Sequence, residues 1–239
     1  MRPFRTLFLV PVLTVLFGCA VEQAAVAPEG LLNVLGPFPG FSPVELPGDW
    51  ALEATNDLAP EQLQVTKIDG VPSLRVTNGE GAFTLVRRTR ALMLATPFLS
   101  WSWNIEPPST TGYHPIRIVV GFITDRNENW REAPEQRLGD ALPIHDKAIT
   151  LTWGESALQR GTMFVPKDTI QRSAARYTVR GGRENAGAWW LETVDLSDLY
   201  KRAWPNEDTS YVQVVFIGIA APGGREPAPA NVSGILLSR

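Results

Sequence analysis

Alternation of apolar and polar residues with a period of two constrains this chain more than any other feature, and it dominates from Trp50 onward. In residues 99–105, Leu, Trp, Trp and Ile alternate with Ser, Ser and Asn, which predicts a strand with one buried face. Residues 116–122 and 149–153 repeat the pattern, whereas 211–220 is apolar on both parities, as in a central strand covered on both faces. Further expected strands are 63–68, 73–77, 83–89, 162–165, 176–180, 189–194 and 232–237, and glycine or proline separates nearly all of them.

Helical patterns are rare in this chain. Residues 195–203 place Leu196, Leu199 and Tyr200 on one face, with acidic residues first, basic residues last and Pro205 just beyond. A weaker helical pattern covers 130–138. Many short strands with one crossover helix predict an all-β fold, an antiparallel β-sandwich of the jelly-roll kind with one or two short helices. A closed barrel is the alternative.

The first nineteen residues have the order of a secretory signal. Arg2 and Arg5 precede a largely apolar run, which ends at Gly18 before Cys19, the single cysteine of the chain. The run is too short for a spanning helix, which needs about 20 apolar residues. Its end resembles the lipobox of bacterial lipoproteins, in which the cysteine receives a diacylglycerol and becomes the first mature residue. We therefore expect lipid attachment at Cys19 and, because Ala20 and Val21 follow, localisation at the outer membrane facing the periplasm.

These features predict a simple domain organisation. Residues 1–18 are the lipoprotein signal peptide, and 19–33, rich in alanine and proline, are expected to be a lipid-anchored flexible tether. Residues 34–239 are expected to form a single β-sandwich domain, with 34–47 as irregular chain laid against it.

Composition excludes several classes of function. Residues 1–18 hold two of the 22 Lys and Arg and none of the 25 Asp and Glu, so the mature chain carries a net charge of −5. This balance, with basic residues scattered, argues against nucleic acid as a partner. With Cys19 acylated no thiol remains for a disulfide, a nucleophile or a cysteine metal site. We expect no cofactor.

Ordered landmarks along the chain resemble the bacterial family DUF3047. They are Leu99-Ser100-Trp101-Ser102-Trp103, the run 117–122, the run 149–155, the strand 189–192 leading to Asp195, and the apolar strand 212–220. The resemblance implies a secreted or envelope β-sandwich similar to carbohydrate-binding modules, with no established activity. Acidic residues that relatives tend to carry before the arginine strand and after the last long strand are replaced here by 112–115 and 221–226, so any ligand role of those acids is in doubt.

Few groups in the sequence suit catalysis. The chain has no G-x-S-x-G motif and only two histidines, His114 and His145. Of the possible metal ligands, His145 and Asp146 with Asp140 form the best cluster, which we interpret as a solvated turn, so no metal site is expected. Glycoside hydrolysis needs two facing carboxylates. Glu155 and Glu192 are the candidate pair, since each shares parity with a tryptophan; the alternative is that each is solvated or paired with an arginine.

The tryptophans divide into core and surface candidates. We expect Trp101, Trp103 and Trp153 in the core of the sandwich. Trp189 and Trp190 must point to opposite faces, and Trp130, amid Asn, Glu and Arg, is the best surface candidate, suited either to stacking on a sugar or to holding a loop on the sheet.

Three hypotheses follow. The first is a non-catalytic β-sandwich, anchored to the membrane by its lipid, that binds a glycan or another envelope component through Trp130, Trp190, Glu155 and Arg117. The second is a polysaccharide-acting enzyme with the Glu155 and Glu192 pair, and the third is an envelope scaffold for another protein. A sandwich fold by itself supports all three.

Overall fold

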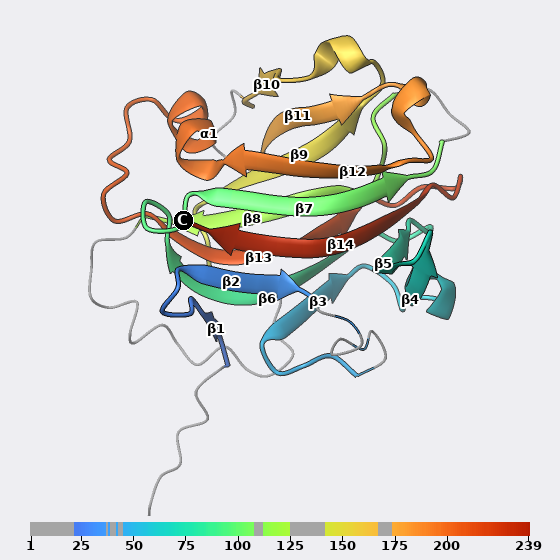
Figure 1. Ribbon diagram of the computed structural model, residues 1–239, viewed down its shortest axis with the longest axis horizontal. Helices are drawn as coiled ribbons and strands as arrows, with labels where there is room; N and C mark the ends of the chain where they lie inside the picture. The colour runs from blue at the N-terminus through green and yellow to red at the C-terminus, as the bar shows by residue number, and fades with distance from the viewer. Residues whose placement is uncertain are drawn as a thin grey trace, which may run out of the picture.

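Two stacked β-sheets make up the protein in the computed structural model, which describes residues 22–36, 38, 42, 45–107, 112–124, 142–166 and 174–239. Figure 1 shows the sheets face to face, with β7, β12 and β14 in the front layer. Within the described ranges the front sheet has six strands, in the order β12-β7-β14-β5-β4 with β2 also pairing β14. Its strands are β2 (Leu31–Leu35), β4 (Leu63–Ile68), β5 (Val71–Thr77), β7 (Phe98–Ile105), β12 (Trp189–Asp195) and β14 (Pro229–Ser238).

The rear sheet has eight strands among the described residues, in the order β1-β6-β13-β8-β9-β11-β10 with β3 also pairing β6. They are β1 (Ala24–Ala25), β3 (Trp50–Ala54), β6 (Phe83–Leu92), β8 (Arg117–Ile123), β9 (Lys147–Gly154), β10 (Met163–Phe164), β11 (Ala175–Gly181) and β13 (Gln213–Ala221). The predicted all-β sandwich is confirmed. Two pairs depart from the antiparallel pattern, since β1 runs parallel to β6 and β11 parallel to β9.

The core between the sheets follows the alternation of the sequence. Leu99, Trp101, Trp103 and Ile105 are fully buried, and Trp153 meets them from the other sheet. The ring of Trp103 lies edge-on to Trp101 at 5.5 Å and to Trp153 at 5.7 Å between centroids. The expectation that these three tryptophans are core residues is therefore correct.

Strand β13 is buried on both faces, as its continuous apolar run predicts. Ile217 and Ile219 belong to the core between the sheets, whereas Phe216 and Ala220 belong to a second cluster on the outer face of the rear sheet. Phe216 crosses Gly121 of β8 so closely that a Cβ there would lie 2.1 Å from its ring. A glycine at this position is what allows the two strands to pair.

Helix α1 (Leu196–Ala203) is the expected helix, and it closes one end of the sandwich (Figure 1). Asp195 caps it by accepting from the backbone N–H groups of Ser197 and Asp198. Tyr200 of its apolar face packs edge-on to Phe122, at 5.3 Å. The weaker helix expected at 130–138 lies outside the described residues. In the described part of the chain no helix is both long enough and apolar enough to cross a membrane.

The N-terminal segment differs from the sequence expectation. Strand β1 pairs with β6, and β2 pairs with the C-terminal strand β14, so the expected flexible tether over 19–33 is wrong from Ala24 onward. The domain therefore starts before residue 34. The physical reason is burial: Leu32, Val34 and Leu35 lie in the core, and the Arg87 guanidinium donates to the backbone of Asn33. Alanine and proline around this run concealed a five-residue strand.

A buried histidine makes stability depend on pH. His114 is almost fully buried, and its Nδ1 accepts from the Ile116 N–H at 3.2 Å. Burial lowers the pKa of His114 from its ordinary 6.5 to about 4. Between these values the unfolded chain binds a proton that the folded chain does not, so stability falls as the pH falls from 6.5 towards 4, by roughly 3 kcal/mol for a shift of this size.

This dependence can be measured by urea unfolding from pH 7.5 to 4.5. His114→Asn keeps an acceptor for Ile116 and has no group that titrates in this range, so its stability is expected to change less with pH. A slope identical to that of the native chain would show that His114 is not responsible.

Candidate functional site

Glu192, one member of the candidate catalytic pair, lies in the interior. It is only 4% exposed and faces the rear sheet from β12. Its Oε1 accepts from Arg180 Nε of β11 at 2.6 Å and from the indole N–H of Trp103 at 3.3 Å. A general acid or base must reach a substrate, and this carboxylate reaches an arginine instead. Glu192 joins the two sheets.

Trp190, a candidate for ligand contact, is half-buried and packs against the same core. The Arg180 guanidinium lies over its ring, 3.8 Å from the centroid. Its indole N–H donates to the backbone oxygen of Asn185 at 2.8 Å. Asn185 thus takes the indole N–H of Trp190, and Arg180 covers one face of its ring.

The other predicted site residues lie apart from this cluster. Glu155 is exposed just beyond the end of β9, so it does not share an enclosed groove with Glu192. Arg117 begins β8, half-buried, on the outer face of the rear sheet. Trp130 and Cys19 lie outside the described residues. The structure therefore brings together Glu192 and Trp190, but inside the sandwich.

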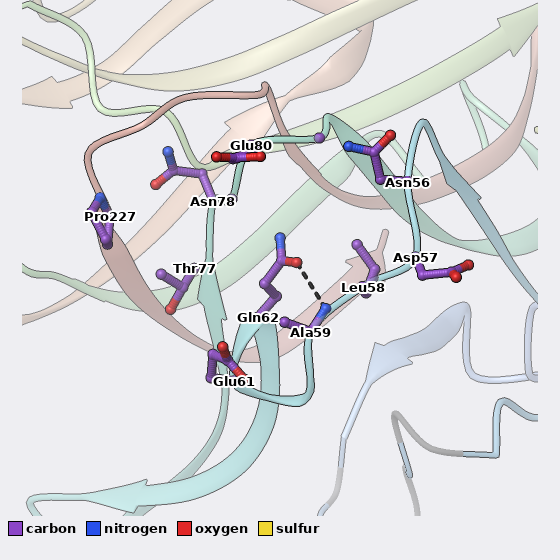
Figure 2. Close-up of a pocket in the computed structure, with 12 residues that line it drawn as sticks. Asn56, Asp57, Leu58, Ala59, Glu61, Gln62, Thr77, Asn78, Glu80 and Pro227 are labelled. Atoms are coloured by element: carbon purple, nitrogen blue, oxygen red, sulfur yellow. Dashed lines mark hydrogen bonds between the residues drawn. The ribbon is translucent and has the colours of Figure 1, made fainter.

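An open cavity of about 400 Å³ lies where the loops before β4 and β6 meet the loop before β14 (Figure 2). We call it the Gln62 pocket. It is lined by amides, carboxylates and small residues, and no aromatic or basic side chain is among the described lining residues. These are Asn56, Asp57, Leu58, Ala59, Glu61, Gln62, Thr77, Asn78, Gly79, Glu80, Gly81 and Pro227.

Gln62 is oriented by a short turn of 3₁₀-helix, η1 (Pro60–Gln62). Pro60 starts the turn, and the Gln62 Oε1 accepts from the Ala59 backbone N–H at 2.9 Å. This bond identifies the amide oxygen, so the Nε2 group is the end that points away from Ala59, against Gly79 in the wall of the cavity (Figure 2). Gln62 is 9% exposed, and its Nε2 is buried without a hydrogen-bond partner. An unpaired buried donor is costly, and a ligand oxygen would satisfy it.

The loop 78–81 is built to leave room for this amide. A Cβ at Gly79 would lie 2.5 Å from Gln62 Nε2, so a larger residue there would displace the Gln62 amide. The Asn78 side chain accepts from the Ala228 N–H at 2.8 Å and donates to the Glu226 carbonyl at 3.1 Å. Asn78 is therefore a structural residue that ties the loop to the start of β14, while Glu61 and Glu80 stay exposed at the rim.

The chemistry of the lining favours a ligand that both accepts and donates hydrogen bonds. The Gln62 amide needs an acceptor, whereas the carboxylates of Asp57, Glu61 and Glu80 need donors. A metal ion would suit the carboxylates alone, and no group of three metal-ligating side chains occurs among the described residues. Sugar hydroxyls satisfy both requirements.

This pocket was not found from the sequence. The signals that could have located it are Pro60 with Gln62 at the third position of a turn, and the polar glycine-rich run Asn78-Gly79-Glu80-Gly81. Neither is specific, because the two runs meet only in the folded chain.

The fold and this pocket define a two-sheet β-sandwich with an open cavity between the loops at the ends of its strands. The chain belongs to the family described as "Protein of unknown function (DUF3047)", which matches residues 49–226, so the predicted resemblance is confirmed. No curated protein matches the chain.

Among solved structures, the chain is similar to the family 11 carbohydrate-binding module from Clostridium thermocellum in complex with a β-1,3-1,4-mixed-linked tetrasaccharide. Identity is 9%, with 89% of this chain and 97% of the module covered and a TM-score of 0.43. It is also similar to endoglucanase 3 of family GH12 from Trichoderma harzianum, at 9% identity over 92% of this chain and 96% of the enzyme, with a TM-score of 0.44. Both similarities are in the path of the backbone, and both are distant.

Proposed function

We propose that this protein is a non-catalytic β-sandwich that binds a glycan of the cell envelope in the Gln62 pocket. The observation that carries the proposal is the Gln62 Nε2 group, which is buried in the wall of an open cavity and has no hydrogen-bond partner. A sugar hydroxyl accepts from this N–H group and donates its own proton to a carboxylate at the rim.

The size and charge of the pocket support this assignment. Its volume, about 400 Å³, lies within the range of about 300–1,000 Å³ typical of small-molecule sites. Because its charged lining residues are Asp57, Glu61 and Glu80, an anionic group is disfavoured there and a neutral sugar is the better ligand.

Substitution of Gln62 by glutamate tests the proposal. Gln62→Glu keeps an oxygen for the Ala59 N–H but replaces the N–H donor with a second oxygen, so a glycan loses one hydrogen bond and meets an extra carboxylate. We expect binding to weaken about tenfold or more, which corresponds to about 1.4 kcal/mol or more. A glycan array that includes peptidoglycan fragments identifies the ligand, and calorimetry with the full chain measures the loss.

Gln64→Glu is the matched control, because it makes the same change two residues further along the chain, at an exposed position of β4. It is expected to bind as the native chain does. If no glycan binds the native chain, or if Gln62→Glu binds as well as Gln64→Glu, the proposal is wrong.

We also propose that a diacylglycerol on Cys19 anchors the protein to the membrane, on the strength of the Arg2, Arg5 and Gly18-Cys19 pattern. The paired strand β1 begins at Ala24, five residues after Cys19, so at most about 18 Å of chain separates the lipid from the sheet. In this proposal the sandwich lies close to the bilayer rather than at the end of a long tether.

Cys19→Ala is expected to move the protein from the membrane fraction to the soluble fraction, or to leave an unprocessed precursor, as fractionation and intact mass would show. Metabolic labelling with a fatty acid should be lost. Lipid labelling that persists in Cys19→Ala would contradict the anchor.

A further inference from the structure

Two arginines share the outer face of the rear sheet. Arg117 of β8 lies opposite Thr152 of β9, and Arg176 of β11 lies opposite Thr150. Thr150 in turn lies opposite Val119, which belongs to the outer cluster with Phe216. The two arginines thus extend from the same face on either side of β9, about 10 Å apart in the direction across the strands and two residues apart along β9. The strand between them is uncharged at these positions.

Aromatic rings hold one of the two guanidinium groups. The Arg176 guanidinium carbon lies 4.3 Å from the ring centroid of Tyr113 and 5.3 Å from that of Phe164. Both rings remain accessible, with Tyr113 37% and Phe164 58% exposed. Stacking against a ring leaves the N–H groups in the guanidinium plane free to bind another group.

Neither arginine has an acidic partner within the described part of the chain. The other half-buried arginines do: Arg180 pairs with Glu192, Arg87 with Asp49 and Arg75 with Glu106. Burial, and in second place the charge of Arg176, lower the pKa of Arg117. Arg117 still stays protonated at neutral pH, so two like charges lie side by side with no counter-charge from the described residues.

We propose that Arg117 and Arg176 bind an anionic group of the glycan, a carboxylate or a phosphate, with its sugar ring against Tyr113 and Phe164. The inference rests on the proposed glycan-binding function and names the class of glycan as acidic. Guanidinium groups bind such oxygens through paired N–H donors, and aromatic rings suit the apolar face of a sugar. The anion supplies the counter-charge that the described residues lack.

The cationic site and the Gln62 pocket have complementary preferences. Register places Phe83 of β6 beside Ala221, and Arg117 beside Ala220, so both sites lie towards the same end of the rear sheet with β13 between them. The acidic pocket disfavours anions, whereas the arginines require one. A polysaccharide with both neutral and acidic sugars offers a ligand to each site.

The test compares trigalacturonate with its methyl ester, which has the same rings without the charge, and with phosphomannan as a phosphate source. The native chain is expected to bind at least one acidic probe at least tenfold more tightly than the ester, and the difference should shrink at high salt. In the double variant Arg117→Gln and Arg176→Gln, binding of that acidic probe should weaken about tenfold or more. Binding of the methyl ester should not change. The difference between trigalacturonate and phosphomannan identifies the anionic group.

Lys67→Gln is the matched control, since Lys67 is an exposed cation on β4 of the other sheet. It should bind every probe as the native chain does. Removing two mutually repelling charges is not expected to lower the melting temperature. If the double variant nevertheless fails to fold, Arg176→Gln alone provides the same comparison at a half-exposed residue.

Equal binding of acid and ester by the native chain, or an unchanged acid affinity in the arginine variants, would overturn this inference. In either case a loss of neutral-glycan binding in Gln62→Glu would leave the proposed function standing. If no saccharide of either kind binds the native chain, both proposals are wrong.

Discussion

Replacing Glu192 with alanine is expected to lower the free energy of unfolding by about 3–5 kcal/mol, as measured by chemical denaturation. The reason is the group left behind: Arg180 is enclosed between the sheets, and Glu192 is its partner at 2.6 Å. Without the carboxylate, a buried positive charge has no counter-charge, and the indole N–H of Trp103 loses its acceptor.

Two comparisons separate this structural role from catalysis. Glu155→Ala, at an exposed carboxylate, should change stability by less than about 0.5 kcal/mol. The double variant Arg180→Leu with Glu192→Leu should be more stable than Glu192→Ala, because an apolar pair leaves no buried charge. If Glu192→Ala folded with native stability and instead abolished a polysaccharide-degrading activity, the enzyme hypothesis would be restored.

Trp101→Ala is also expected to destabilise the protein by about 3–5 kcal/mol, through loss of the largest kind of side chain from a closed core. Trp101 is fully buried on β7 and packs edge-on to Trp103 at 5.5 Å. A cavity at this point would also loosen Trp103, which donates to Glu192. Thermal and urea unfolding would measure the loss.

Trp101→Phe is the matched control. The Trp101 indole N–H is buried without a hydrogen-bond partner, so phenylalanine removes an unsatisfied donor and keeps much of the ring. Its cost should be clearly smaller than that of alanine. A native melting temperature for Trp101→Ala would instead mean that the ring is accessible and does not support the core.

Local pattern predicted the strands because burial on a pleated strand repeats every second residue. The segment 99–105 needed no knowledge of its neighbours, since any sheet that buries Trp101 also buries Trp103. The strand at Leu31–Leu35 was missed for a related reason: Leu, Leu, Asn, Val and Leu do not alternate, and the partner that buries them, β14, is about 200 residues away in the sequence.

The two-residue period of a strand correctly placed Glu192 and Trp190 on the same face of β12. It could not show whether that face is turned to the other sheet or to solvent. In the structure the face is turned inward, and Arg180, from the opposite sheet, neutralises the acid and stacks on the indole. The same composition on an outward face would have formed a sugar platform. Sequence spacing alone does not distinguish these two outcomes.

The sequence by itself thus determined a strand-built sandwich, its tryptophan core and the helix after Asp195, because periodicity and capping act over a few residues. Only the tertiary structure decided where chemistry can occur: it enclosed Glu192, joined Gln62 to the loop at Gly79, and set Arg117 beside Arg176. The physical reason is that burial and charge pairing depend on contacts between distant strands, which no local pattern encodes.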